Sequence, residues 1–362
     1  MGDKKIMIKR VGDTKIKSYE LNDPTVTVHQ KLLEAGIPVP EIISIEKTKQ
    51  GKLIKTVKWV PGETFAELIA RQALTNDHWH AFGEFFAGMN NVGITATDLV
   101  YRNILLKEDG TVILCDMAKL YMSDFLEEPI VRYILNNMYF SRELKDAFLA
   151  GYRKHRPIDL NDLLDKEIAV NYDGYQDLYL STDRIRKGVR SNKRLTMLKD
   201  KFAGKDVLDI GCSSGGMISR HVAHLGAHAI YGIDKVQRSG TRYMVDLARY
   251  LAYLENVNIE FSSIDCEHQH FINKIKDVAW DFIFFMAMVG HLKGDRVAYV
   301  RFLKSITKVL YFESNLGNRK EQTDIFLKEV GFSKVECLGE SGDPDRDPNN
   351  HYVLYRCETG KG

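Results

Sequence analysis

The residues that point most clearly to chemistry lie in the second half of the chain, in the stretch Val207–Gly215. An apolar run enters Asp209, and Gly211 and Gly215 follow, so we expect the backbone to turn sharply and to pass close to a ligand. The Gly-x-x-x-Gly spacing differs from the Gly-x-Gly-x-x-Gly of dinucleotide sites, and no phosphate-binding lysine follows it. A second apolar run ends at Asp234, 23 residues beyond Gly211. A carboxylate at that place can accept hydrogen bonds from the 2′- and 3′-hydroxyls of a ribose.

A third run ends at Asp265, which suits an adenine amino group. Together these residues resemble the class I S-adenosylmethionine-dependent methyltransferase family over about residues 204–358. The resemblance implies a Rossmann-like, seven-stranded sheet with an antiparallel last strand. It also implies that Gly211 and Gly215 line the methionine moiety, Asp234 binds ribose, Asp265 contacts adenine, and Asp209 positions the methionine ammonium. The alternative is a generic Rossmann-like domain that binds another nucleotide.

Methyl transfer requires an acceptor in line with the sulfonium, and a base when the acceptor is an unactivated hydroxyl or amine. His291, just after the fourth predicted strand, is the favoured candidate for this base. Glu313, at the end of a later strand, is a weaker one. The alternative for His291 is a packing or hydrogen-bonding role beside the cofactor.

A basic segment precedes the first strand of this half. Residues 184–205 contain nine basic side chains and one acidic one, Asp200. In relatives such as the enzymes that modify tRNA wobble uridines, a similar arginine-rich lead-in helix covers the cofactor. We therefore expect Arg190 and Arg194 to contact an anionic substrate or the cofactor carboxylate; the alternative is a solvated helix face.

A second constellation lies in the first half, where Asp98 is followed five residues later by Asn103, and Asp116 ends a short apolar run. In phosphotransferases this spacing provides a catalytic aspartate, a metal-binding asparagine and the main magnesium ligand. A turn at residues 108–110 separates the two halves of the pattern.

These residues resemble the aminoglycoside-phosphotransferase and lipopolysaccharide-kinase branch of the protein-kinase-like family, over about residues 4–155. The resemblance implies that Mg²⁺ and ATP bind there, with Lys9 as the phosphate-binding lysine and Lys17 as a competitor. Three features depart from the family: Ala96 replaces the usual histidine, Met117 follows Asp116, and no room precedes Lys9 for a glycine-rich loop. An active phosphotransferase and a pseudokinase both stay open, as does a chance Asp-x-x-x-x-Asn in a helical domain.

The pattern of predicted strands and helices that must position these residues changes near residues 155–200. Short strands followed by helices predict a small α+β kinase-like domain over 1–155, then a linker and basic lead-in helix over 156–203. Strand–helix alternation predicts a parallel α/β methyltransferase domain over 204–362. The expected strands are 206–210, 229–233, 258–262, 280–286, 309–313, 334–338 and 352–356, and the expected helices run to about 225, over 240–253 and over 320–330.

Composition excludes several classes of protein. A hydrophobic fraction of 44% with 28% charged residues is that of a soluble globular chain, and a net charge of +2 argues against a dedicated nucleic-acid binder. Five widely spaced cysteines predict neither a zinc ribbon nor a disulfide framework. No apolar run is long enough to span a bilayer and the start has no signal-type apolar core, so we expect a cytoplasmic protein.

The two halves together resemble bacterial bifunctional polysaccharide kinase–methyltransferases, in the opposite order. The resemblance implies a glycan, glycolipid or related small polar acceptor, phosphorylated by one domain and methylated by the other. The first alternative is an RNA methyltransferase of the tRNA type with a pseudokinase domain, which would use the basic segment as its phosphate contact. The second is a pseudokinase-based scaffold or regulatory protein.

Overall fold

The computed structural model describes two compact units, Met1–Leu160 and Asn161–Gly362. The described residues are 8–11, 14–20, 24–50, 52–96, 101–115, 120–122, 131, 134–135, 140–171, 178–180, 185–186, 193–213, 215–235, 245–314, 320–341 and 352–360. Three predicted site residues, Asp98, Asp116 and Arg190, lie outside them. The finer division at residues 155 and 203 stays a prediction.

Unit 1 begins with a four-stranded antiparallel sheet in the order β1-β2-β4-β3. Helix α1 connects β2 to β3, and it begins at Pro24, a residue that suits the first turn of a helix. The elements are β1 (Ile8–Val11), β2 (Thr14–Glu20), α1 (Pro24–Glu34), β3 (Ile42–Lys47) and β4 (Lys52–Lys58).

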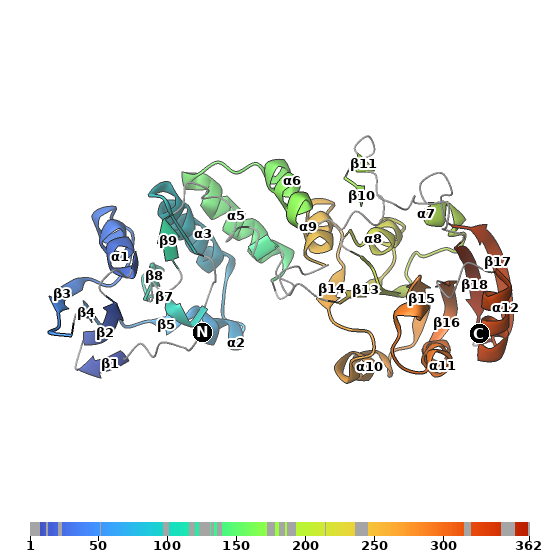
Figure 1. Ribbon diagram of the computed structural model, residues 1–362. Coiled ribbons are helices and arrows are strands. Elements are labelled where there is room, and N and C mark those ends of the chain that lie inside the picture. Colours follow the sequence, from blue (N-terminus) through green and yellow to red (C-terminus); the bar gives the residue numbers. More distant parts are fainter. Residues whose placement is uncertain are drawn as a thin grey trace. The chain divides into compact units, whose positions relative to one another are not determined.

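The rest of unit 1 is built around two helices, α3 and α5, which lie side by side (Figure 1). Gly83 of α3 and Gly151 of α5 allow this close approach, because a Cβ atom on either would overlap the backbone of the other helix. Phe82 and Phe148 pack edge to face between them. The elements are β5 (Glu63–Thr64), α2 (Phe65–Ala70), α3 (Asn76–Asn91), β6 (Ile94–Ala96), η1 (Tyr101–Asn103), β7 (Ile104–Leu106), β8 (Val112–Leu114), β9 (Leu120–Met122) and α5 (Arg142–His155).

The predicted turn at residues 108–110 is confirmed, since β7 and β8 form an antiparallel hairpin around it. The Asp109 carboxylate accepts a hydrogen bond from the Thr111 backbone at 2.9 Å and closes the turn. Hydrogen bonds from Thr111 and Lys107 lower the pKa of Asp109 to about 2, so this carboxylate stays charged. The hairpin connects the segment that carries Asn103 to the segment that leads into Asp116.

Unit 2 contains a seven-stranded sheet in the order β14-β13-β12-β15-β16-β18-β17. Strands β12 to β16 pair in parallel, and β18 runs antiparallel to both of its neighbours, so the expected sheet with an antiparallel last strand is confirmed. The strands are β12 (Asp206–Ile210), β13 (Ala229–Asp234), β14 (Glu260–Ser263), β15 (Trp280–Met286), β16 (Thr307–Glu313), β17 (Lys334–Glu340) and β18 (Val353–Glu358).

Helices cover both faces of this sheet (Figure 1). Because side chains alternate along a strand, Val207 and Phe284 pack with α8, whereas Leu208 and Phe285 pack with α10, α11 and α12. The helices are α6 (Leu160–Asn171), α7 (Lys193–Met197), α8 (Met217–His224), α9 (Asp246–Leu254), α10 (Gln269–Ile275), η2 (Val289–His291), α11 (Arg296–Ile306) and α12 (Lys320–Val330); a short pair, β10 (Leu178–Tyr179) and β11 (Ile185–Arg186), lies before α7.

Two helices were not expected from the sequence, α10 and α11. Helix α11 has a clear signal in retrospect, because Val297, Val300, Leu303 and Ile306 repeat every three residues behind the N-cap Asp295. Helix α11 provides the crossover between the adjacent parallel strands β15 and β16, and α10 lies in the longer connection that returns from the edge strand β14 to β15. The late strands and α12 agree with their expected ranges to within a few residues.

Candidate functional site

A crevice is expected at the carboxyl ends of β12 and β15. The chain passes from β12 through β13 to β14, and then returns to place β15 on the other side of β12. Where the strand order reverses in this way, the outgoing loops separate and leave room for a ligand. The loops that follow β12, β13, β14 and β15 carry the predicted residues Gly211, Asp234, Asp265 and His291.

The glycine turn after β12 is pinned to the end of β13. The amides of Gly211 and Cys212 both donate to the Ile233 carbonyl, at 2.8 and 3.0 Å, and the Ser213 amide donates to Asp234 Oδ2 at 2.8 Å. Gly211 has φ 82° and Ser213 φ 61°. A left-handed non-glycine residue is strained, and such strain is typical of ligand-binding turns.

Asp234 has both carboxylate oxygens engaged by backbone amides, since the Lys235 amide donates to Oδ1 at 2.8 Å. A carboxylate offers about four lone-pair positions. The two amides therefore orient the Asp234 carboxylate at the carboxyl end of β13.

Gly211 and Gly215 lie on opposite sides of this turn. A Cβ atom on Gly211 would overlap the side chain of Met288, which belongs to the loop after β15. Gly215 comes just before α8, and a Cβ there would approach Leu178 Cδ1 to 2.7 Å. A side chain at Gly211 would therefore meet both Met288 and an unfavourable positive φ, whereas one at Gly215 would require the end of the Leu178 side chain to shift.

Asp209 is 3% exposed, and its Oδ2 accepts a hydrogen bond from the Ser219 hydroxyl of α8 at 2.7 Å. Burial, with a smaller contribution from the nearby Asp234, raises the pKa of Asp209 against the opposing hydrogen bonds from Ser219 and the charge of Arg194, to a net value of about 6. A cationic group brought beside Asp209 would remove the penalty for its negative charge. The site therefore suits an ammonium group.

The loop after β14 offers polar groups to the same crevice. Its first residue is linked to β13, because the Ile264 amide donates to the Asp234 carbonyl at 2.8 Å. Asp265 Oδ1 accepts the Glu267 amide at 2.9 Å, and Oδ2 of this half-exposed carboxylate lies 3.8 Å from Nζ of Lys293. The Ser263 hydroxyl is buried and has no hydrogen-bond partner within the described part of the chain. A buried hydroxyl without a hydrogen-bond partner at this strand end fits a site in which a polar ligand would supply the partner.

His291 is exposed at the end of η2, and its amide donates to the Met288 carbonyl at 2.9 Å. Because Met288 lies against Gly211, the loop that carries His291 borders the glycine turn. Ala287, at the start of this loop, has φ 58° and donates its amide to the Glu313 carbonyl at 2.8 Å.

Arg194 lies on α7 and is buried, so it does not belong to a solvated helix face, which was the alternative. Its Nε donates to Glu313 Oε1 at 2.9 Å, a terminal nitrogen donates to Oε2, and Ser341 also donates to this carboxylate. This fork holds α7 at the end of β16, so Arg194 and Glu313 fit a positioning role better than substrate contact or base catalysis.

A second ionic group anchors the chain just after α7. Asp200 accepts hydrogen bonds from Arg356 at 2.7 and 3.0 Å and from the Tyr311 hydroxyl at 2.7 Å. The lead-in segment is therefore joined to β16 and β18 through two separate sets of charged contacts.

In unit 1, Asn103 ends η1, and its carbonyl accepts the amide of Cys115 at 2.8 Å. Cys115 immediately precedes Asp116 in the sequence, and Asp116 itself lies outside the described residues. Lys9 lies on β1 opposite Ile16, and Lys17 lies on β2 directly opposite Lys55. Their roles, like those of the other predicted site residues, stay predictions.

Lys55 on β4 is a buried cation of the four-stranded sheet, 2% exposed. Its Nζ lies 3.0 Å from Nδ1 of His29 on α1, and His29 Nε2 lies 2.7 Å from the Pro40 carbonyl. A carbonyl can only accept and an ammonium can only donate, so these partners assign the proton of His29 to Nε2.

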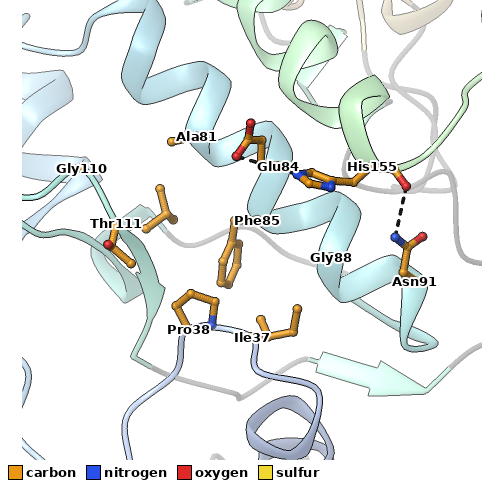
Figure 2. A pocket seen from close by; sticks show the side chains of 11 residues that line it. Ile37, Pro38, Ala81, Glu84, Phe85, Gly88, Asn91, Gly110, Thr111 and His155 are labelled. Carbon is orange, nitrogen blue, oxygen red and sulfur yellow. Dashed lines mark hydrogen bonds and ion pairs between the residues drawn. The ribbon is translucent and has the colours of Figure 1, made fainter.

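A pocket of about 360 Å³ lies on one face of α3 (Figure 2). Figure 2 shows Phe85 between Pro38 and Gly88, with the Glu84–His155 ion pair at one side. The remaining lining residues are Ile37, Ala81, Asn91, Gly110, Thr111 and Val112. None of the predicted site residues lines this pocket.

Within the described residues, no group of three or more His, Cys, Asp or Glu side chains is placed to hold a metal ion. The predicted magnesium ligand Asp116 lies outside that part of the chain. None of the five cysteines forms a disulfide bond, and Cys337 is exposed. No described helix combines the length and the apolar character needed to cross a membrane.

Sequence reasoning missed several residues that shape the candidate site. Ser213, Ser263, Glu267 and Met288 all lie within three residues of a predicted site residue. Position at a strand end was an available signal for Ser263. Nothing local indicated the partners of Glu267, which are 26 and 27 residues away.

Residues 25–146 match the lipopolysaccharide kinase (Kdo/WaaP) family. Among solved structures, the bifunctional kinase-methyltransferase WbdD is similar in its co-crystal with the kinase inhibitor LY294002, with a TM-score of 0.44, 18% identity and coverage of 54% of this chain and 47% of that one. Its medium-resolution structure has a TM-score of 0.42, 18% identity and coverage of 54% and 46%. This chain thus covers less than half of the WbdD structures. No curated protein matches it.

At these scores the WbdD likeness does not decide the fold of unit 2, which rests on its own strand order and pairing. The match of residues 25–146 to a family of kinases supports the expectation that the chain is an enzyme, and it does so through its family likeness alone. Residues 25–146 are a lipopolysaccharide-kinase-like region, and the chain joins that region to a seven-stranded sheet of methyltransferase topology.

Proposed function

We propose that this chain is an S-adenosylmethionine-dependent methyltransferase that acts on a glycan, glycolipid or related small polar acceptor. The observation that carries the proposal is the glycine turn of Gly211, pinned by its hydrogen bonds to the end of β13 at Asp234, where the strand order reverses. We further propose that the kinase-like region binds Mg²⁺ with ATP and phosphorylates the same substrate.

Bound S-adenosylmethionine supplies an electrophilic methyl group on a sulfonium. Asp234 accepts hydrogen bonds from the ribose hydroxyls, Asp265 accepts from the adenine amino group, and Asp209 faces the ammonium. The missing side chain at Gly211 lets the backbone approach the methionine part. His291 holds the proton that leaves the acceptor hydroxyl, which raises the nucleophilicity of that oxygen.

Arg194 and Glu313 fix α7 to the sheet, and Arg190, further along the basic segment, is left as the candidate contact for an anionic acceptor. In the kinase-like region, Asp98 orients the acceptor hydroxyl, while Asn103 and Asp116 hold magnesium and Lys9 or Lys17 meets the phosphates. A cytoplasmic location is part of the same proposal.

Calorimetry with S-adenosylhomocysteine on the full chain tests the methyltransferase assignment. Asp234→Ala should weaken binding by about 1.5–3 kcal/mol, because two ribose hydroxyls lose a charged acceptor. Gly211→Val should abolish it, and Asp277→Ala, an exposed acid of the same unit, should leave it unchanged. Unchanged affinity in Asp234→Ala would remove the ribose assignment.

A thermal-shift titration with ATP, with and without Mg²⁺, tests the kinase-like region. We expect a magnesium-dependent shift that Asp116→Asn abolishes and that Asp146→Asn, an exposed acid on α5, retains. S-adenosylhomocysteine binding should survive in Asp116→Asn. No shift under any condition would favour the pseudokinase alternative.

Neither alternative function gains support from the comparisons, which match a kinase family and kinase-methyltransferase structures. An RNA substrate would show itself as RNA affinity that falls steeply with salt, since phosphate contacts release counterions.

A further inference from the structure

Two carboxylates of the loop after β14 reach the loop after β15: Asp265 Oδ2 lies 3.8 Å from Nζ of Lys293, and the closer contacts are made by Glu267. Its Oε2 accepts the Lys293 amide at 2.9 Å, and its Oε1 accepts the Gly294 amide at 2.8 Å. Both oxygens of the side chain are thus used on two successive amides of the other loop. Such charge-assisted bonds are the stronger kind of hydrogen bond.

The backbone of Glu267 is itself fixed. Its amide donates to Asp265 Oδ1 at 2.9 Å, and the intervening Cys266 is buried. The Cys266 carbonyl accepts the Tyr299 hydroxyl of α11 at 3.0 Å. Glu267 therefore orients the Asp265 side chain through its backbone amide, and its carboxylate binds two amides of the loop after β15.

The two amides bound by Glu267, those of Lys293 and Gly294, lie between His291 and the start of α11. On the upstream side, η2 ends at His291, and Leu292 is buried in the core. On the downstream side, Asp295 caps α11 by accepting the Ala298 amide at 3.0 Å. The two bonds to Glu267 thus complete the fixation of the short segment that presents His291 beside the glycine turn.

We propose that Glu267 is a positioning residue that couples cofactor binding to the order of the acceptor-side loop. This rests on the proposed function, in which Asp265 meets adenine and His291 meets the acceptor. A ligand that engages Asp265 also restrains Glu267, and Glu267 in turn restrains Lys293 and Gly294. Binding of the adenine end of the cofactor thereby reduces the mobility of the loop that carries His291.

Amide hydrogen exchange on the full chain, with S-adenosylhomocysteine as the probe, tests this coupling. In Glu267→Gln one oxygen acceptor is replaced by a donor, so Lys293 and Gly294 should exchange about tenfold faster or more. In the wild type the probe should protect residues 289–294; in Glu267→Gln that protection should disappear while the calorimetric affinity changes by less than about threefold.

Two further variants keep the test specific. Gly294→Ala leaves the charge intact but places a Cβ 3.1 Å from Glu267 Oε1, so it should weaken the same protection to a smaller degree. Glu260→Gln removes an exposed carboxylate that pairs only with Lys274 among the described contacts, and it should behave as the wild type.

The outcomes separate this inference from the proposed function. If the probe does not bind the wild type in calorimetry, the proposed function fails and the coupling fails with it. If the probe binds but leaves residues 289–294 equally exchangeable, or protects them equally in Glu267→Gln, only the coupling is overturned. Loss of protection confined to Glu267→Gln and Gly294→Ala supports it.

Discussion

The two units bury a cation in different ways. In unit 1, Lys55 of β4 donates to Nδ1 of the His29 ring on α1, and His29 Nε2 lies against the Pro40 carbonyl. In unit 2, Arg194 of α7 meets the carboxylate of Glu313 through two nitrogens, so that pair is neutral overall. In each unit the contact holds a helix against a sheet.

The difference shows what a buried charge requires. Removing a cation from water costs several kcal/mol, and an opposite charge offsets much of that cost whereas a neutral acceptor offsets less. A guanidinium and a carboxylate also match as a planar fork, which fixes orientation as well as distance. We therefore expect the forked Arg194 contact to be the more rigid of the two.

The largest effect is expected from Glu313→Gln, which leaves the buried Arg194 facing an uncharged side chain. Breaking a buried ion pair from one side costs about 3–5 kcal/mol of unfolding free energy. Native-state hydrogen exchange of the β16 amides measures this. The double change Arg194→Met with Glu313→Leu should lose less than the single one; an equal or greater loss would contradict the assignment of the cost to the uncompensated charge.

A smaller effect is expected from Lys55→Met, which keeps the length of the side chain but removes the donor to His29 Nδ1. A buried acceptor that loses its donor costs about 1–3 kcal/mol. Exchange of the α1 amides reports the loss. Lys58→Met, an exposed lysine on the same strand, is the matched control and should stay within about 0.5 kcal/mol. A gain in stability in Lys55→Met would show that the buried cation costs more than its contacts return.

Asp209 offers a third arrangement, a buried acid whose pKa is raised to about 6 from an ordinary 3.8. The folded state favours the protonated form, so the stabilising contribution of Asp209 is complete below about pH 4 and is lost as the pH rises to about 6. That loss amounts to about 1.4 kcal/mol per pH unit.

Ligand binding should have the opposite pH dependence, because only the charged carboxylate attracts an ammonium. Affinity for S-adenosylhomocysteine should fall by up to about tenfold per unit as the pH drops below 6. Calorimetry between pH 5 and 8 measures it, and Asp209→Asn should remove this dependence. The same pH profile in Asp209→Asn would assign the titration to another group.

The smallest effect is expected from Glu63→Gln, which breaks an ion pair with Arg71 at 2.6 Å in which both side chains are 57% exposed. Exposed pairs contribute about 0–1 kcal/mol, and salt screens them. Thermal unfolding at low and at high salt should show little change. A loss as large as that of Glu313→Gln would mean that burial does not govern the strength of these pairs.

The sequence by itself determined the elements that depend on neighbouring residues. An apolar run before Asp209, glycines at 211 and 215 and an acid at the end of the next run predict a strand, a tight turn and a second strand, because chain geometry and side-chain alternation act locally. The β7–β8 hairpin follows from the same kind of pattern. The antiparallel pairing of β17 and β18 followed from two runs joined without a helix.

Tertiary structure decided which distant groups meet. Arg194 was expected at an anionic ligand, yet the fold places it on Glu313, 119 residues later in the chain. The sequence likewise gives no sign of the hydrogen bond from the Gly294 amide to Glu267 or of the hydrogen bond between Lys55 and His29. Each of these contacts depends on how separate loops or helices pack against one another. A buried charge pairs with a group that this packing brings near, because a buried charge without a partner costs several kcal/mol.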